Sequence, residues 1–144
     1  MSDVVRLHLD DWSIATTICR KYPNMKCLEA TAELMNYFRE RAEVIFACTL
    51  EVALRPFIVH VSLPNDIISE TGQHWAVMLH GKVFDNLHPE GEQLEKWMLN
   101  FEFATKNWGD GHFSEEILER WTYKEFVRYL RKCRRTLLGI PKGT

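Results

Sequence analysis

Residues 73–91 read Gln73-His74-Trp75-Ala76-Val77-Met78-Leu79-His80-Gly81-Lys82-Val83-Phe84-Asp85-Asn86-Leu87-His88-Pro89-Glu90-Gly91. Two runs of β-prone residues, 75–79 and 83–87, flank the pair Gly81-Lys82. A glycine at the first central position of a two-residue turn is typical of type II′ hairpins. The segment therefore predicts a β-hairpin.

The predicted hairpin carries polar side chains that strand packing alone does not require. His74 begins the first strand, and the pair Asp85-Asn86 lies in the second. An imidazole beside a carboxylate or carboxamide forms two parts of a nucleophile, base and orienter unit, in which the orienter fixes the tautomer and direction of the base. The part still missing is the nucleophile.

Length and composition predict one ordinary domain. A chain of 144 residues, 46% hydrophobic and 26% charged, buries about two thirds of its unfolded surface without disulfides or metals. The formal net charge of −2 provides no general attraction to nucleic acid or to an anionic membrane. A basic run near the C-terminus is interpreted as the solvated face of a helix. It consists of Arg128, Arg131, Lys132, Arg134 and Arg135.

The sequence contains no apolar run long enough to span a bilayer. Its first residues, Met1-Ser2-Asp3, lack the basic and apolar regions of a signal peptide. We therefore expect a cytoplasmic protein, which other means could still deliver into a target cell.

The cysteines are the natural candidates for the nucleophile. Because they form no CxxC pair, neither a zinc site nor a disulfide framework is predicted. Cys19, Cys48 and Cys133 lie inside helical or strand patterns, where free cysteine usually serves as a small hydrophobe. Cys27 differs because it follows the turn-like segment 23–26 and begins a helical pattern.

The start of a helix favours thiol chemistry. Free backbone N–H groups and the positive end of the helix dipole stabilise a thiolate, and Lys26 beside Cys27 acts in the same direction. The same N–H groups can stabilise the oxyanion of a tetrahedral intermediate. Cys27 is therefore the predicted nucleophile.

The remaining elements predict an α+β fold in one domain, residues 1–144, with a helical C-terminal extension over 102–144. Residues 4–9 are predicted to form a short strand or an extended lead-in, and residues 64–72 a polar loop. Residues 102–113 are expected to be irregular, and residues 139–144 are expected to lack regular structure. Helices are predicted over 11–22, 27–41 and 123–137, together with one opened by Pro89-Glu90-Gly91-Glu92 and one capped by Ser114-Glu115-Glu116; strands are predicted over 44–50 and 57–63.

This order of parts resembles the papain-like cysteine hydrolases, in which a helix begins with cysteine and a histidine-led hairpin follows. The hairpin is similar to a narrower group, the second family of papain-fold toxin domains of bacterial polymorphic toxin systems. The motif stands here as Gly72-Gln73-His74, then the run from Gly81 to Gly91, then Trp97. The resemblance covers about residues 24–101 and is specific in the hairpin.

The resemblance implies a papain-like fold with Cys27 as nucleophile, His74 as general base and Asp85 as orienter. The expected hairpin register disagrees with the assignment of Asp85. A two-residue turn at Gly81-Lys82 places Met78 opposite Asp85, so the carboxylate lies four positions from His74, roughly 13 Å at strand rise. A bulge, a wider turn or a bent strand start would have to close the gap. Otherwise Asn86 or His88 would be the orienter, each also needing a bulge.

Two further residues are candidates for the oxyanion site, Gln73 beside the base and Asn24 before the cysteine. The expected activity is hydrolysis of protein amide bonds by a cysteine peptidase or a protein glutamine deamidase, in a bacterial toxin or effector. The alternatives are a catalytically idle binding module and a transglutaminase or acyltransferase with the same triad.

The expected partners are a protein or peptide substrate and a cognate immunity protein, with neither nucleic acid nor membrane. No cofactor is expected. His8, His60 and His112 have no partner at metal-ligand spacing, so no metal site is expected either.

Overall fold

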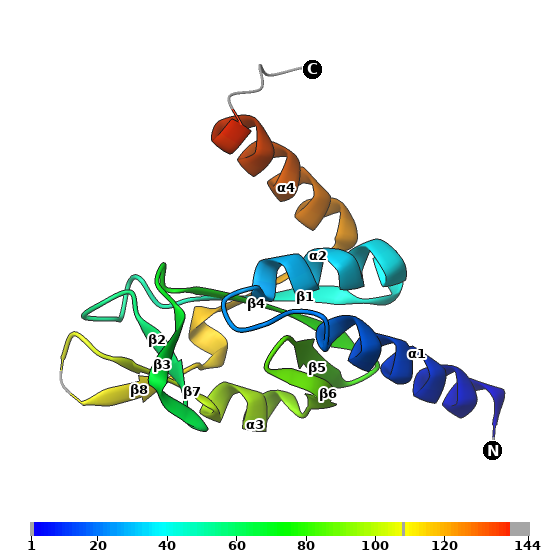
Figure 1. The fold of residues 1–144 in the computed structure, drawn as a ribbon, viewed down its shortest axis with the longest axis horizontal. Helices are drawn as coiled ribbons and strands as arrows, with labels where there is room; N and C mark the ends of the chain where they lie inside the picture. The colour runs from blue at the N-terminus through cyan, green and yellow to red at the C-terminus, as the bar shows by residue number, and fades with distance from the viewer. Residues whose placement is uncertain (1, 108, 139–144) are drawn as a thin grey trace.

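The computed structural model describes residues 2–107 and 109–138 (Figure 1). Its helices and short 3-10 helices are α1 (Asp3–Cys19), α2 (Cys27–Phe38), η1 (Arg39–Arg41), α3 (Leu94–Leu99), η2 (Glu115–Ile117) and α4 (Tyr123–Leu138). Its strands are β1 (Glu43–Cys48), β2 (Ile58–His60), β3 (Leu63–Ser69), β4 (Gln73–Leu79), β5 (Lys82–Asp85), β6 (His88–Glu92), β7 (Phe101–Ala104), β8 (Asp110–His112) and β9 (Leu118–Trp121).

Two antiparallel sheets organise these elements. The larger sheet has the order β6-β5-β4-β1-β9, and the smaller has the order β3-β2-β7-β8. Helices α1 and α2 lie along the larger sheet, while α3 and the smaller sheet lie on its other side (Figure 1). The fold is therefore α+β, with the N-terminal helices packed on antiparallel sheets, as predicted.

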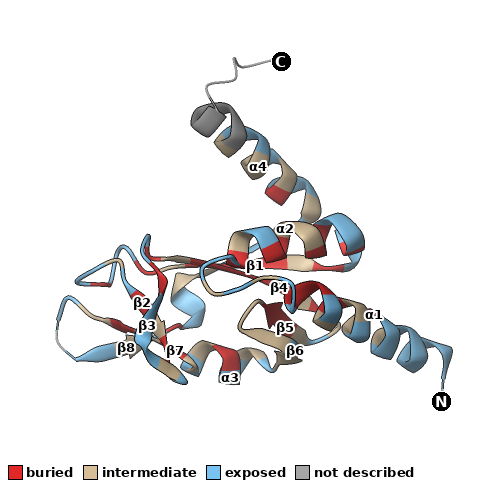
Figure 2. Cartoon of the chain, viewed as in Figure 1, coloured by how far each residue is buried: buried red, intermediate tan, exposed pale blue. Residues whose placement is uncertain are grey.

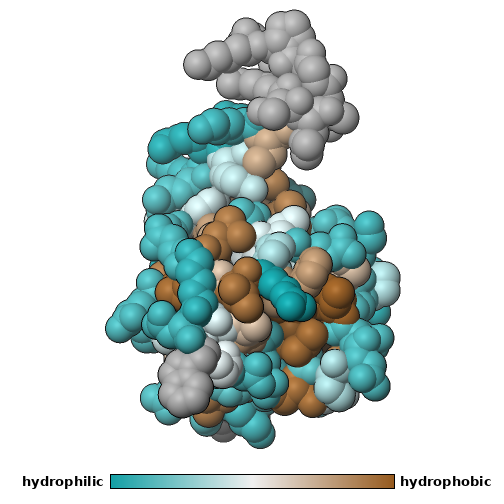
Figure 3. Space-filling view, turned by 90° about the vertical axis from the view of Figure 1, so that its left-hand side faces the viewer, coloured by the Kyte–Doolittle hydropathy of each residue, from teal (hydrophilic) through white to brown (hydrophobic). Residues whose placement is uncertain are grey.

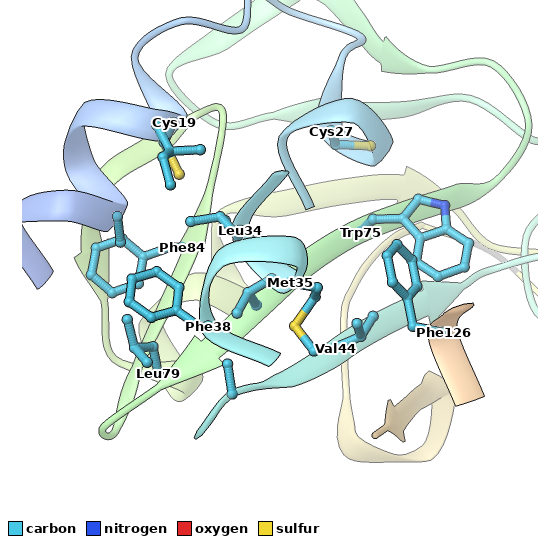
Figure 4. Packing of buried hydrophobic residues seen from close by; sticks show 14 of the residues in the cluster. Cys19, Cys27, Leu34, Met35, Phe38, Val44, Trp75, Leu79, Phe84 and Phe126 are labelled. Carbon is cyan, nitrogen blue, oxygen red and sulfur yellow. The ribbon is translucent and has the colours of Figure 1, made fainter. Parts of the chain in front are cut away.

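Both faces of the larger sheet are buried because alternate residues of β1 and β4 point to opposite sides. Val44, Trp75 and Val77 belong to the cluster that includes residues of α1 and α2, in which Trp75 lies beside Phe126 (Figure 4). Ile45, Ala47 and Ala76 pack instead with Trp97, Phe101 and Phe113. The buried residues accordingly concentrate in β1, β4 and the elements that cover them (Figure 2). A strand covered on both faces has little freedom to shift register, which favours a fixed site at the end of β4.

The β4–β5 hairpin turns one residue earlier than predicted. Leu79 pairs with Lys82, so His80 and Gly81 occupy the turn. Both have positive φ, 48° and 83°, which is typical of type I′ rather than type II′ turns. His80 tolerates this conformation because its ring stacks on His8 and hydrogen-bonds to Asp11. The prediction of a central Gly81-Lys82 pair was wrong.

Three other local predictions, all for residues before 93, were also wrong. Residues 4–9 belong to α1, because Ser2 caps this helix by accepting from the backbone N–H of Val5 at 3.2 Å. Residues 63–69 form β3, where Pro64 is tolerated because β3 is an edge strand. Residues 89–92 belong to β6, and at Gly91 a Cβ atom would lie 2.8 Å from the Phe84 ring.

The remaining differences lie toward the C-terminus. The segment predicted to be irregular contains β7 and β8. In β7, Phe101 and Phe103 are buried and alternate with Glu102 and Ala104. The segment 114–121 contains η2 and β9 rather than a longer helix. The C-terminal extension is thus only partly helical. Because β9 pairs with β1 and Phe126 of α4 is buried in the core, we propose that this region belongs to the same domain.

The predicted helix over 123–137 is confirmed as α4, whereas the prediction for 139–144 lies outside the described residues. Over the part of the chain that the structure describes, no helix combines the length and apolar character needed to cross a membrane.

Candidate active site

Cys27 is the first residue of α2, as predicted. The helix begins without a side-chain cap, and the backbone N–H groups of Cys27, Leu28 and Glu29 find no hydrogen-bond acceptor among the described residues. Such groups are the unpaired donors that every helix start leaves. Met25, just before the helix, has a φ of 72°. Cys27 retains only 8% of its full solvent exposure. The unpaired backbone N–H groups lie at the same helix start.

His74 and Asp85 meet directly. The His74 Nε2 atom lies 2.8 Å from Asp85 Oδ2, and both side chains are almost completely buried. The earlier turn explains the contact, because extending the observed β4–β5 register places Asp85 opposite Ala76, two residues from His74. Diagonal neighbours on one face are within reach of long side chains. The predicted gap of four positions was wrong, and β4 and β5 pair here without a bulge.

Asp85 is saturated with hydrogen-bond donors. Its Oδ2 also accepts from Trp97 Nε1 at 2.8 Å. Its Oδ1 accepts from the backbone N–H groups of Leu87 and His88, at 2.9 and 2.7 Å, and lies 2.8 Å from His88 Nδ1. A buried carboxyl surrounded by donors is ionised. Burial raises the pKa of Asp85, but its interactions with His88 and His74 lower it by more, so that the net pKa lies well below the usual range.

The second nitrogen of His74 has a different environment from Nε2. Its Nδ1 atom is buried and makes no hydrogen bond within the described part of the chain. Burial lowers the pKa of His74, while interaction with Cys27 and the hydrogen bond to Asp85 raise it, and the net pKa is about 10. A buried imidazolium paired with the ionised Asp85 accounts for this direction. The structure thus brings Cys27, His74 and Asp85 together.

A cavity of about 260 Å³ opens beside Cys27. Its wall combines residues from the loop before α2, the end of β3, the start of β4 and α4. The lining residues are Met25, Cys27, Leu28, Ile68, Ser69, Glu70, Thr71, Gln73, Trp75 and Tyr129. Gln73 therefore lies in the same cavity wall as Cys27, and its role at the oxyanion site stays a prediction.

The two asparagines that the sequence singled out hold the loop before Cys27. Asn86 donates from Nδ2 to the carbonyl of Pro23 at 2.7 Å, and Asn24 donates to the carbonyl of Ile67 at 3.1 Å. The side-chain amide nitrogen of Asn24 is thus hydrogen-bonded to the backbone of β3. We interpret both residues as supports of the loop, whereas the prediction of Asn86 as orienter of His74 is replaced by the observed contact of Asp85.

Some residues of the site were missed. Trp97 was singled out only as part of the motif and not as a partner of Asp85, although a buried indole N–H usually has a partner. His60 and Asn100 both contact His88 Nε2 at 3.0 Å. Their positions on β2 and after α3 gave no sequence signal, because only the smaller sheet brings them to the hairpin. Among the described residues, no three His, Cys, Asp or Glu side chains are arranged to hold a metal ion.

A thiol at a helix start, packed against an antiparallel sheet that carries a paired histidine and acid, is the arrangement of the papain-like class. The model of the family described as papain fold toxin 2 matches residues 12–102, and the chain belongs to this family. Membership implies a papain-like hydrolase toxin. Searches of curated proteins and of solved structures found no match.

The raised pKa of His74 predicts how stability depends on pH. A histidine whose folded pKa is about 10, against about 6.5 when unfolded, stabilises the fold fully below pH 6.5 and loses this contribution as pH rises toward 10. We expect the melting temperature to fall through this window, measured by calorimetry across pH. Burial also raises the pKa of the Cys19 thiol to about 12. Because the unfolded thiol ionises at lower pH than the folded one, Cys19 adds to the loss of stability only above about pH 9.

The matched comparison is His74→Gln, which cannot titrate. Its melting temperature should change less between pH 6.5 and 9 than that of the unmodified chain. Equal slopes for the two proteins would contradict a raised pKa at His74.

Proposed function

We propose that the protein is a cysteine hydrolase of protein amide bonds, either a peptidase or a protein glutamine deamidase, and that it acts as a bacterial toxin or effector. The observation that carries the proposal is the arrangement of His74, whose Nε2 is held by a buried, ionised Asp85 while its buried Nδ1 makes no hydrogen bond among the described residues. A base held in this way has one nitrogen fixed and the other available for a thiol.

The proposed chemistry begins with the thiolate of Cys27. Its sulfur attacks the carbonyl carbon of an amide, and the resulting oxyanion lies near the unpaired N–H groups at the start of α2. The imidazolium of His74 gives its proton to the leaving nitrogen, which departs as an amine from a peptide or as ammonia from glutamine. Water, deprotonated by His74, then hydrolyses the thioester and restores the thiol.

Exposed apolar side chains on the smaller sheet, whose strand β3 also lines the cavity, support a polypeptide substrate rather than a small metabolite. Apolar side chains gather among polar ones on the face that includes the smaller sheet (Figure 3). Exposed apolar residues from this sheet and its loops are Leu50, Val52, Leu54, Phe57, Val61 and Ile67. Exposed apolar surface beside a pocket is typical of sites that bind proteins. The expected partners are therefore a protein substrate and an immunity protein that blocks the site.

Helix α4 contributes to the cavity wall from outside the family-matched region. Tyr129 lines the cavity and packs against Trp75 and Trp121, with ring centroids 5.0 and 5.2 Å apart. Residue 129 lies outside the matched residues 12–102. Substrate choice is thus proposed to depend partly on a helix that belongs to this chain rather than to the shared core.

The toxin proposal is tested by expression in a bacterial host. The unmodified chain should arrest growth, and Cys27→Ala should restore growth, because the substitution removes the only atom that can form the thioester. Growth is measured by optical density after induction, with protein levels checked by immunoblot.

Cys48→Ala is the matched control, since Cys48 is a free, half-buried thiol that does not line the cavity beside Cys27, and it should remain harmful. If Cys27→Ala arrests growth as strongly as the unmodified chain, the hydrolase proposal fails. If the unmodified chain does not arrest growth and its Cys27 is alkylated no faster than Cys48, the catalytically idle binding module is favoured. Incorporation of an added amine into the target, rather than conversion of glutamine to glutamate or chain cleavage, would favour the transferase.

A further inference from the structure

A second pair of histidines lies behind the acid of the proposed triad. His88 Nδ1 lies 2.8 Å from Asp85 Oδ1, and His88 Nε2 lies 3.0 Å from His60 Nε2. The remaining nitrogen of His60, Nδ1, lies 3.1 Å from the backbone nitrogen of Ser62 and 2.7 Å from its Oγ. A continuous chain of contacts thus runs from His74 through Asp85 and His88 to the backbone that follows β2.

A single backbone group fixes the protons of this chain. The N–H of Ser62 can only donate, so His60 Nδ1 must accept, and a neutral His60 then carries its proton on Nε2. That proton points at His88 Nε2, which must therefore accept as well. His88 consequently carries its proton on Nδ1 and donates it to Asp85 Oδ1.

Two independent features agree with this assignment. The side-chain amide nitrogen of Asn100 also lies 3.0 Å from His88 Nε2, where only an acceptor suits an amide donor. Burial is the largest cause of the lowered pKa of His60. His60 is thus kept neutral, as its contact with the Ser62 N–H requires.

We infer that His88 and His60 are positioning residues of the proposed reaction: the directed chain from Ser62 through both imidazoles turns the Asp85 carboxylate so that Oδ2 stays on His74 Nε2–H. His88 restrains Oδ1 from the side opposite to His74, and His60 selects the tautomer of His88 that can donate. Neither histidine touches the substrate. The inference rests on the proposed function, because it concerns the basicity and direction of His74.

The expected effect appears in the pH profile of Cys27 modification. When the carboxylate is no longer held, the imidazolium of His74 is less well stabilised, and the thiolate of Cys27 forms only at higher pH. His88→Ala should therefore slow alkylation by iodoacetamide about tenfold to a hundredfold near pH 6, the range found when outer partners of a site residue are removed. Near pH 9, where an ordinary thiol ionises, the rates should converge.

Conservative variants separate positioning from folding. His88→Asn retains a donor near the position of Nδ1 and should recover part of the rate, whereas His60→Gln retains a donor near the position of Nε2 and should stay close to the unmodified chain. His60→Phe removes the donor and should behave like His88→Ala. His112→Ala removes a histidine whose Nδ1 contacts the carbonyl of Phe101 on the same sheet; it is the matched control and should leave the profile unchanged.

Melting temperatures are measured alongside, so that only folded variants are compared. Folded His88→Ala and His60→Phe with the profile of the unmodified chain would overturn the inference, as would His88→Asn that is no faster than His88→Ala. These results would leave the proposed function intact. If Cys27 of the unmodified chain reacts no faster than Cys48, the proposed function itself fails, so the two failures are distinguishable.

Discussion

Replacing His74 by alanine is expected to slow alkylation of Cys27 by about a hundredfold or more near pH 6. The reason is the loss of the imidazolium that stabilises the thiolate, since an unassisted thiol with a pKa of about 8.5 is almost entirely protonated at that pH. Hydrolysis of the natural substrate should fall by about 10²- to 10⁴-fold, because the proton donor to the leaving nitrogen is also lost. The measurement is mass-spectrometric quantification of modified Cys27 over time.

His80→Ala is the matched control for this experiment. His80 lies in the turn of the same hairpin, but its ring hydrogen-bonds to Asp11 Oδ2 at 2.8 Å rather than to any residue of the site. This variant should retain rapid alkylation of Cys27. If His74→Ala reacts as fast as the unmodified chain, or if Cys19, Cys48 and Cys27 all react alike, the thiolate and imidazolium pair does not exist.

The pairing of His74 with Asp85 was the weakest part of the sequence-based prediction, and its resolution shows what sequence can carry. Both residues could be assigned to one face of the hairpin by their alternation alone. Their separation depended on whether the turn included His80 or Lys82. His80 adopts positive φ because His8 and Asp11 support its ring, and these residues lie some seventy positions away. Contacts so distant in sequence left no local signal.

The position of Cys27 could be predicted because it depends on a local property. A helical repeat that begins directly after a turn places its first residue at the helix N-terminus wherever the helix packs. The smaller sheet could not be predicted in the same way. Its strands β2, β7 and β8 have three or four residues each, and such short segments gain their stability from pairing rather than from propensity. The partners of His88 therefore remained hidden, since His60 reaches it only through that sheet.

Replacing Asp85 by alanine is expected to have the largest effect on stability of any substitution in the site. Five hydrogen bonds converge on this fully buried carboxylate, so its removal leaves donors from His74, Trp97 and His88 without an acceptor. Breaking a buried ion pair by removing one partner costs about 3–5 kcal/mol, a large share of the roughly 5–15 kcal/mol by which a domain is stable. The free energy of unfolding is measured by urea denaturation near neutral pH.

Asp85→Asn distinguishes the electrostatic contribution from the loss of volume. The carboxamide keeps one acceptor oxygen, but its NH₂ group must face a donor, either Nε2–H of His74 or the N–H groups of Leu87 and His88. We therefore expect a smaller loss of stability than in Asp85→Ala, together with slow alkylation of Cys27, because His74 is no longer beside a negative charge.

Asp11→Ala is the matched control for losing a buried aspartate. Asp11 pairs with Arg41 at 2.6 Å and with His80 at 2.8 Å, and both partners are partly exposed and can bind water once the carboxylate is gone. This variant should lose less stability than Asp85→Ala and should retain rapid alkylation of Cys27. If Asp85→Asn is as stable and as reactive as the unmodified chain, the charge of Asp85 has no part in the site, and a neutral hydrogen-bond acceptor is sufficient to hold His74.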